Sequence, residues 1–242
     1  MIASPVLILG ARSDIGRALA RAYAAGGAAV ILAGRGDLEA DRSDLELRSG
    51  GSVTAVPFDV TDGAPDAFFA SLGGVPGTVV LVAGLLGDQA QSAADDATAA
   101  CVMETNYTGA ARYLLAAARV MQGKTDACII GISSVAGDRG RGSNYIYGAA
   151  KAGLTAFLSG MRNAHAKTGL HVMTVKPGFV RTQMTIGMKL PGALTASPEQ
   201  VATAILRAHE KRRDVIYVLG RWRLVMAIIT AIPEAIFKKL SL

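Results

Sequence analysis

The chain has 242 residues, 51% of them hydrophobic, which is enough to bury one sizeable core and excludes a disordered protein. The formal charge of +6 comes from scattered basic residues, without the Lys/Arg clusters and interleaved aromatic residues of a nucleic-acid-binding surface, so no nucleic acid partner is expected. Cys101 and Cys128 lie far apart, which argues against a disulfide framework or a zinc site and favours a cytoplasmic protein.

Short β-rich apolar runs alternate with longer helical stretches along the chain. The predicted strands are residues 6–9, 29–33, 53–56, 78–82, 127–132 and 171–175. The predicted helices are residues 14–26, 41–49, 64–72, 96–122, 145–168 and 197–211. The runs are continuous rather than alternating in polarity, as expected when helices cover both faces of a sheet. This alternation predicts an α/β Rossmann-type three-layer sandwich with a doubly wound parallel sheet.

The first predicted strand runs through a glycine-containing turn directly into a helix. Backbone N–H groups at such a helix start can bind the pyrophosphate of a dinucleotide. Two glycines alone are weak evidence in a chain with 28 of them, and a plain structural turn is the alternative. The residues assigned to cofactor binding in this turn are Gly10, Arg12, Ser13, Asp14, Ile15 and Gly16.

The most specific pattern is Tyr147 followed four residues later by Lys151. Residues i and i+4 share one helix face and can reach the same ligand. An ammonium group beside a phenol is expected to lower the phenol pKa from about 10, which would let Tyr147 act as an acid/base near neutral pH. Ser134 ends the fifth predicted strand, where it can hydrogen-bond a substrate carbonyl. Singly, these residues also fit a helix aromatic, a surface charge and a strand-end cap; together they favour catalysis.

From Val6 to about His209 the sequence resembles the short-chain dehydrogenase/reductase family. The resemblance implies that Tyr147 donates the proton, that Lys151 also binds the nicotinamide ribose, and that Asn106 holds a relay water. Ser134 is the fourth catalytic residue, and no metal site is implied. The resemblance also implies cofactor contacts from Asp59, Val60, Ala83, Gly84, Tyr147, Lys151, Pro177, Gly178, Val180 and Thr182.

The glycine turn departs from the family pattern at Asp14, where the family has its middle glycine. An acid beside a pyrophosphate is electrostatically unfavourable. We therefore expect Asp14 to point away from the pyrophosphate and to cap the following helix.

The same turn resembles that of the decaprenylphosphoryl-2-keto-ribose reductases, as do residues 84–88, 106–108, 143–148, 180–184 and 232–240. This resemblance implies reduction of the 2-keto group of a polyprenylphosphoryl pentofuranose, the second half of a 2′-epimerisation in cell wall biosynthesis, with a flavin-dependent oxidase as partner. The alternatives are a soluble carbonyl or 3-oxoacyl reductase and a catalytically idle NADP-sensing binding protein.

The second predicted strand leads into Gly34 and Arg35, without the acid that would bind the ribose 2′-hydroxyl of NAD. This favours NADP(H), with Arg35 and Arg12 as partners of the 2′-phosphate. Arg35 as an ordinary surface charge is the alternative, and NAD(H) then stays open.

Residues 1–220 are assigned to the NAD(P)-binding catalytic domain and residues 221–242 to an apolar helical tail with basic residues at both ends. Its apolar run, residues 224–232, is shorter than the roughly 20 residues that cross a bilayer. Such a tail packs on its own domain or in an oligomer interface, or lies at a membrane surface. We expect a homo-oligomer, with contact at the inner membrane face as the open alternative.

Overall fold

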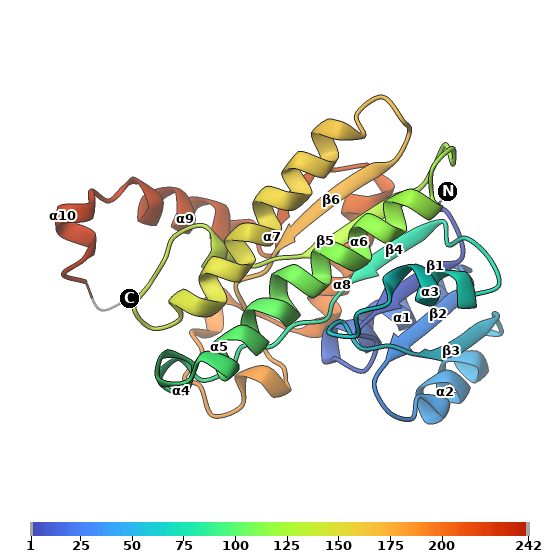
Figure 1. Cartoon of the computed structure of the whole chain (residues 1–242), viewed down its shortest axis with the longest axis horizontal. Coiled ribbons are helices and arrows are strands. Elements are labelled where there is room, and N and C mark those ends of the chain that lie inside the picture. Colours follow the sequence, from blue (N-terminus) through green and yellow to red (C-terminus); the bar gives the residue numbers. More distant parts are fainter. Residues whose placement is uncertain (1, 241–242) are drawn as a thin grey trace.

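Seven short runs of mostly buried residues form one parallel sheet in the computed structural model, which describes residues 2–240 (Figure 1). The strand order is β3-β2-β1-β4-β5-β6-β9. The strands are β1 (Val6–Leu9), β2 (Val30–Gly34), β3 (Val53–Pro57), β4 (Thr78–Leu81), β5 (Cys128–Ile132), β6 (His171–Lys176) and β9 (Val215–Tyr217). The first six confirm the predicted strands to within one residue at each end, and β9 was not predicted.

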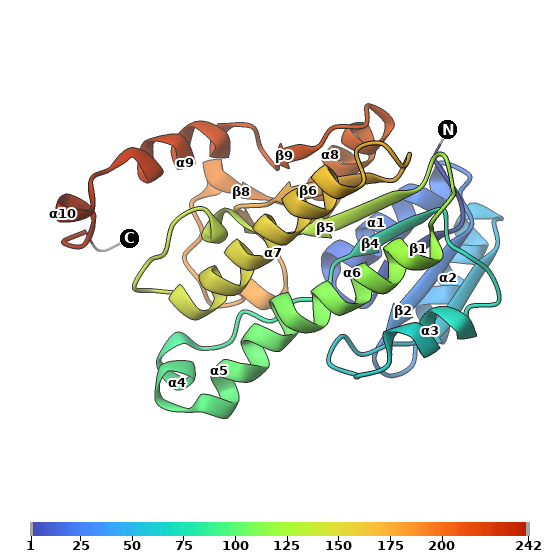
Figure 2. The same cartoon turned by 45° about the horizontal axis from the view of Figure 1, so that its top comes forward.

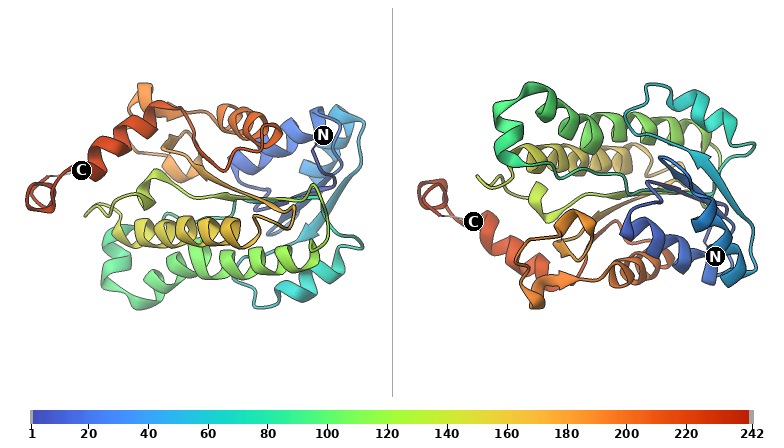
Figure 3. Two further views of the ribbon diagram at one scale, coloured as in Figure 1. Left: turned by 90° about the horizontal axis from the view of Figure 1, so that it is seen from above. Right: turned by 90° about the horizontal axis from the view of Figure 1, so that it is seen from below.

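Helices cover both faces of the sheet, which confirms the predicted three-layer architecture (Figure 3). One face carries α1 (Asp14–Ala25), α2 (Glu39–Ser49) and α8 (Pro198–Glu210). The other carries α3 (Pro65–Ser71), α6 (Gly109–Val120) and α7 (Tyr145–Ala164).

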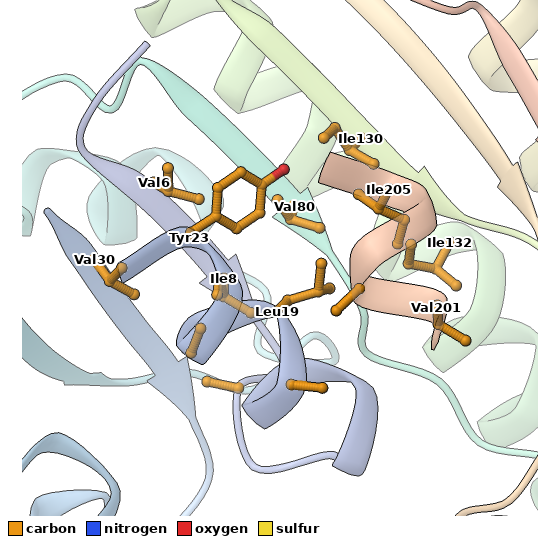
Figure 4. Packing of buried hydrophobic residues seen from close by; sticks show 14 of the residues in the cluster. Val6, Ile8, Leu19, Tyr23, Val30, Val80, Ile130, Ile132, Val201 and Ile205 are labelled. Atoms are coloured by element: carbon orange, nitrogen blue, oxygen red, sulfur yellow. The ribbon is translucent and has the colours of Figure 1, made fainter. Parts of the chain in front are cut away.

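Each sheet face has its own apolar core because successive residues of a strand point to opposite sides. In β1, Val6 and Ile8 belong to the core under α1 and α8, whereas Leu7 and Leu9 belong to the core under α6 and α7. Figure 4 shows the first core, in which Leu19 of α1 packs near residues of α8. Burial of each such side chain contributes about 1.5–3 kcal/mol, so both cores hold the strand ends in fixed register.

The predicted helix 96–122 consists of three pieces. It contains α5 (Asp96–Met103), a π-helical turn (Glu104–Thr108) and α6, and it is preceded by the unpredicted α4 (Gln89–Ala94). A Cβ at Gly109 would lie 2.2 Å from the carbonyl oxygen of Val60, so only glycine fits where α6 begins. The π-helical turn therefore lies where the start of α6 contacts the segment after β3.

The tail forms α9 (Arg221–Ala231) and α10 (Glu234–Phe237), which extend beyond the sheet at the end opposite the N-terminus (Figure 2). The last two residues of the predicted tail, Ser241 and Leu242, lie outside the described residues. Within residues 2–240, every helix is too short or too polar to cross a lipid bilayer.

Candidate active site

The predicted site residues follow the carboxyl ends of neighbouring parallel strands. The glycine turn follows β1, Ala83 and Gly84 follow β4, Ser134 follows β5, and Pro177 follows β6. Because β1, β4, β5 and β6 are neighbours in the sheet, these segments form one continuous edge. Open α/β sheets bind their ligands at this edge.

The turn after β1 is shaped to approach a phosphate closely. Gly10 has φ +98°, and a Cβ there would lie 2.6 Å from the backbone nitrogen of Ala83. A Cβ at Gly16 would lie 2.6 Å from the carbonyl oxygen of Gly10. Ser13 caps α1, since its Oγ accepts a hydrogen bond from Gly16 N at 3.0 Å and donates one to Gly10 O at 2.8 Å. The turn therefore fits the dinucleotide that the sequence predicts there.

The expectation that Asp14 caps α1 was wrong, because Ser13 has that role. Asp14 Oδ2 instead accepts a 2.7 Å hydrogen bond from the backbone N–H of Gln183, in the segment after β6. Ile15, the next residue of the turn, packs against the core under α1 and α8.

A cleft of about 410 Å³ runs along the edge from the glycine turn. It brings eight of the predicted cofactor residues together: Gly10, Arg12, Ser13, Arg35, Asp59, Val60, Ala83 and Gly84. Its lining also includes residues that the sequence did not single out: Gly34, Phe58, Thr61, Leu85, Cys101 and Thr105. A larger hollow of about 860 Å³ between β9 and α9 contains none of the predicted catalytic residues.

Two guanidinium groups lie at the β2 end of the cleft. Arg12 Nη1 donates a 2.9 Å hydrogen bond to the carbonyl oxygen of Arg35. The Arg35 side chain is 81% exposed and lies 3.8 Å from Asp59 Oδ2. The pKa of Asp59 is lowered, mainly by a backbone hydrogen bond from Thr61 and also by the Arg35 charge. Asp59 is thus ionised at neutral pH, and Arg35 is free to move toward an anion.

Ser134 lies near enough to Tyr147 to influence the pKa of its phenol, and Lys151 lies beside both. Ser134 Oγ also accepts a 3.1 Å hydrogen bond from Ala136 N, which fixes the hydroxyl at the end of β5. Lys151 is 4% exposed, and its Nζ donates a 3.0 Å hydrogen bond to the carbonyl oxygen of Ile132. That Nζ lies 5.8 Å from the centroid of the Tyr147 ring, so the predicted grouping is present.

The expected lowering of the tyrosine pKa is wrong for this structure. Burial raises the pKa of Tyr147 to about 12, against the smaller opposing effect of the Ser134 hydrogen bond. Burial also lowers the pKa of Lys151 to about 8. The cost of burying the charged phenolate dominates this pKa. The Lys151 ammonium is directed at the carbonyl oxygen of Ile132. The phenol is therefore protonated at neutral pH and can donate its proton.

Asn106 is fully buried in the π-helical turn. Its Nδ2 donates to the carbonyl oxygens of Leu85 (2.6 Å) and Val102 (2.8 Å), and its Oδ1 accepts from Leu85 N at 3.2 Å. A Cβ at Gly84 would lie 3.2 Å from Asn106 Oδ1 and 3.6 Å from Lys151 Nζ. Gly84 thus leaves open the space beside both polar groups, whereas the relay water stays a prediction.

The segment after β6 is held by the tail and by its own turn. A Cβ at Gly178 would lie 1.9 Å from the Trp222 indole, which packs directly on this glycine. The Trp222 Nε1 group donates a 3.0 Å hydrogen bond to Leu194 O. Val180 is buried in β7 (Phe179–Val180), which pairs with β8 (Thr195–Ala196), and Thr182 begins the next turn. Trp222 was not predicted as part of the site, because nothing in the local sequence links it to Gly178.

Comparisons with known proteins identify relatives along most of the chain. A family model described as short chain dehydrogenase matches residues 4–190. An uncharacterized oxidoreductase of Mycobacterium tuberculosis is 37% identical, over 98% of this chain and 97% of its own length. The 3-oxoacyl-[acyl-carrier-protein] reductase of Escherichia coli is 31% identical, over 88% of this chain and 92% of its own length. The structure of a short-chain dehydrogenase from Sphingobium yanoikuyae in complex with NADPH has a TM-score of 0.81 and 25% identity, over 96% of this chain and 98% of that one.

Proposed function

The chain belongs to the short-chain dehydrogenase/reductase family of oxidoreductases, and we propose that it reduces a ketone to a secondary alcohol with NADPH. The observation that carries the proposal is the grouping of Ser134, Tyr147 and buried Lys151, with Lys151 Nζ 5.8 Å from the centroid of the Tyr147 ring. These three residues follow β5 in the chain. The neighbouring strand β4 leads into Ala83 and Gly84, which line the cleft beside the glycine turn. A cofactor-sensing protein would not need these hydroxyl groups.

The nicotinamide cofactor, bound by the glycine turn and by residues 83 and 84, supplies the hydride. Ser134 donates a hydrogen bond to the ketone oxygen, and Tyr147 transfers its phenolic proton to that oxygen as the alcohol forms. The charge left on the Tyr147 oxygen is stabilised by the Lys151 ammonium. Its pKa of about 8 keeps Lys151 mostly protonated at neutral pH. Asn106 holds the water through which Tyr147 regains a proton.

NADP(H) is the preferred cofactor, with NAD(H) as the alternative. Arg12 and Arg35 line the end of the cleft, and β2 ends at Gly34 and Arg35 without an acid there to bind a ribose 2′-hydroxyl. Arg35 leaves its 3.8 Å contact with Asp59 to bind the 2′-phosphate.

The substrate is a polyprenylphosphoryl pentofuranose with a 2-keto group, which a flavin-dependent oxidase partner supplies in a 2′-epimerisation of cell wall biosynthesis. The sequence of the glycine turn supports this choice, and so do apolar side chains exposed beyond the site. On α9, Leu224 is 67% exposed and Ile228 is 60% exposed. An apolar surface of this kind suits a substrate that carries a lipid.

The tail, residues 221–242, is proposed to place the cytoplasmic enzyme at the inner membrane face, while residues 1–220 form the catalytic domain. Exposed apolar residues of α9 and α10 would enter the headgroup region of the bilayer. Four exposed cations suit anionic lipid: Arg221, Arg223, Lys238 and Lys239. A homo-oligomer interface is the alternative use of this surface.

A 3-oxoacyl thioester is the second candidate substrate, favoured by the 31% identity to a 3-oxoacyl-[acyl-carrier-protein] reductase. To distinguish the two, NADPH consumption is measured with a polyprenylphosphoryl 2-keto-pentofuranose and with a 3-oxoacyl thioester of equal concentration. We expect turnover with the lipid-linked sugar to be at least about tenfold faster. The reverse ratio would assign the thioester. NADPH binding without turnover of either substrate or of small ketones would indicate the idle sensor.

A further inference from the structure

Asp14 joins two segments that lie 169 positions apart in the sequence. Its Oδ2 accepts a 2.7 Å hydrogen bond from the backbone N–H of Gln183. A glycine, which the family pattern has at this position, offers no side-chain acceptor. We propose that Asp14 is a positioning residue that pins the segment after β7 to the cofactor turn.

The hydrogen bond between Asp14 and Gln183, called the pin below, connects two segments at the catalytic edge of the sheet. Asp14 begins α1, directly after the glycine turn at the end of β1, whereas Gln183 lies beyond β6 and β7. In the sheet, β4 and β5 separate β1 from β6. In the right-hand view of Figure 3 the orange segment after β6 comes beside the blue start of α1, as the hydrogen bond requires. A cofactor that runs along this edge would pass between the two joined segments.

The pinned turn is stiff enough for one contact to fix its position. Thr182 N donates a 3.1 Å hydrogen bond to Thr185 Oγ1, and that hydroxyl donates a 2.8 Å bond to Val180 O. Two further backbone bonds, from Thr185 N to Thr182 O and from Met188 N to Thr185 O, continue the turn. A contact at Gln183 therefore sets the place of the whole segment from Val180 to Met188.

The segment presents large apolar side chains to solvent: Met184 is 44%, Ile186 70% and Met188 47% exposed. The chain that leads into this segment passes the catalytic turn, since Val135 N donates a 3.0 Å hydrogen bond to Pro177 O. The role of these side chains rests on the proposed ketone reduction: they contact the apolar part of the substrate. Asp14 keeps them in place before either ligand binds.

The donor and the acceptor of the pin can be removed separately. Gln183→Pro deletes the N–H, and the backbone accepts it because Thr182 is extended (φ −140°, ψ 170°) and Gln183 is the first residue of the turn. Gln183→Ala changes the same side chain but keeps the N–H, so it is the matched control. Asp14→Ala deletes the acceptor.

Hydrogen–deuterium exchange of residues 184–190 in the ligand-free protein tests the pin without any substrate. A hydrogen bond to a charged group contributes enough to stability that we expect Asp14→Ala and Gln183→Pro each to speed exchange about tenfold. The double variant should exchange no faster than either single variant, because both remove the same contact. Gln183→Ala should exchange like the wild type.

Unchanged exchange in Asp14→Ala, or additive effects in the double variant, would overturn the proposal. Loss of NADPH binding in Asp14→Ala with normal exchange would instead make Asp14 a cofactor ligand. With the ketone that establishes the proposed function, both single variants should raise KM at least about fivefold more than they lower kcat. If no ketone is reduced by the wild type, the exchange results still decide the role of Asp14.

Discussion

Tyr147 keeps its proton at neutral pH because burial raises the pKa of the phenol to about 12. Tyr147→Phe removes the transferable proton and leaves the ring in place. We expect turnover to fall at least about 100-fold, which is the usual contribution of a general acid, with the Kd for NADPH within twofold of the wild type. Steady-state kinetics and fluorescence titration measure the two quantities.

The control for this change is Tyr145→Phe. Tyr145 is the first residue of α7, two positions before Tyr147, and its side chain is 48% exposed. It should keep most of the turnover. If Tyr147→Phe retained more than about a tenth of wild-type activity, Tyr147 would not be the acid.

Arg35 offers a test of cofactor preference at the same scale. Its proposed partner, the 2′-phosphate, exists in NADPH and not in NADH. Arg35→Ala should therefore raise the KM for NADPH about tenfold and the KM for NADH less than about twofold, as expected for loss of a charge-assisted contact. Arg48→Ala on α2, which removes an exposed pair with Asp44, is the control. An equal rise for both cofactors would show that Arg35 does not recognise the phosphate.

Arg139 binds the C-terminal part of the tail to the catalytic edge, in addition to the Trp222 contact with Gly178. Its Nη1 donates to the carbonyl oxygens of Thr230 (3.0 Å) and Ile232 (2.7 Å), and its Nη2 pairs with Glu234 at 2.7 Å. Its guanidinium carbon lies 4.0 Å from the centroid of the Phe237 ring. Arg139 follows the turn that begins at Ser134. The position of the tail is therefore linked to the catalytic turn.

The exposed face of α9 can be changed without disturbing its buried face. Leu224→Gln with Ile228→Gln alters two exposed residues and leaves Trp222 and Met226 buried. Binding to anionic vesicles should weaken at least about tenfold, since each lost apolar side chain removes 1 kcal/mol or more of partitioning energy. Turnover of the lipid-linked ketone should fall with it, and NADPH affinity should not change. Vesicle sedimentation measures the binding.

Leu47→Gln is the matched control, because Leu47 is 88% exposed on α2, far along the chain from the tail. Vesicle binding that survives the double change would remove the membrane role. A change from oligomer to monomer in light scattering would assign the face to a subunit interface instead. Deletion of residues 222–242 is a poorer test, because it also uncovers Gly178 by removing Trp222.

Secondary-structure elements were predicted well from the sequence where burial requires a local run of apolar residues. Five of the predicted strands, β1, β2, β4, β5 and β6, are buried along their whole length, and their mostly apolar runs show it because helices cover both of their faces. The edge strand β9 has only three residues, with Val215 46% exposed, so its sequence carries no such run. The π-helical turn depends on contacts with Val60 and Leu85, which are distant in sequence. Helical periodicity therefore predicted one uninterrupted helix.

The same distinction explains the site. The spacing of Tyr147 and Lys151 and the glycine turn were predictable because each is a local pattern. Trp222 on Gly178 and Arg139 on α9 are contacts between residues 44 or more positions apart, and no local pattern indicates them. The protonation of Tyr147 depends on burial, which the sequence does not specify residue by residue.

Across the whole molecule, a buried histidine links acid stability to the packing of two helices. Tyr23 of α1 and His209 of α8 lie 3.1 Å apart between the hydroxyl oxygen and Nδ1. Burial lowers the pKa of His209 from 6.5 to about 4. Between pH 6.5 and pH 4, His209 therefore binds a proton in the unfolded chain but not in the folded chain. Stability is therefore full above pH 6.5 and is lost as the pH falls toward 4.

Urea unfolding at pH 7 and pH 5 checks this dependence. His209 should lower the free energy of unfolding by about 2 kcal/mol between these pH values. His171, whose pKa burial also lowers, adds to the loss. His209→Leu should reduce the pH dependence by that amount, whereas His165→Gln at the end of α7 should leave it intact. An unchanged slope in His209→Leu would show that folding does not lower the pKa of His209.

Because all strands of the sheet run in the same direction, the molecule has two different ends, called poles here: one at the carboxyl ends of the strands and one at their amino ends. Every pairing in the seven-stranded sheet is parallel, so all of the reacting groups and the tail gather at one pole. The chain enters β1 from the other pole, near Ile2 (Figure 1). A bead, an electrode or a fused protein attached beside Ile2 would thus leave the reacting pole facing outward. Attachment through the tail would turn the same pole toward the support and block access to it.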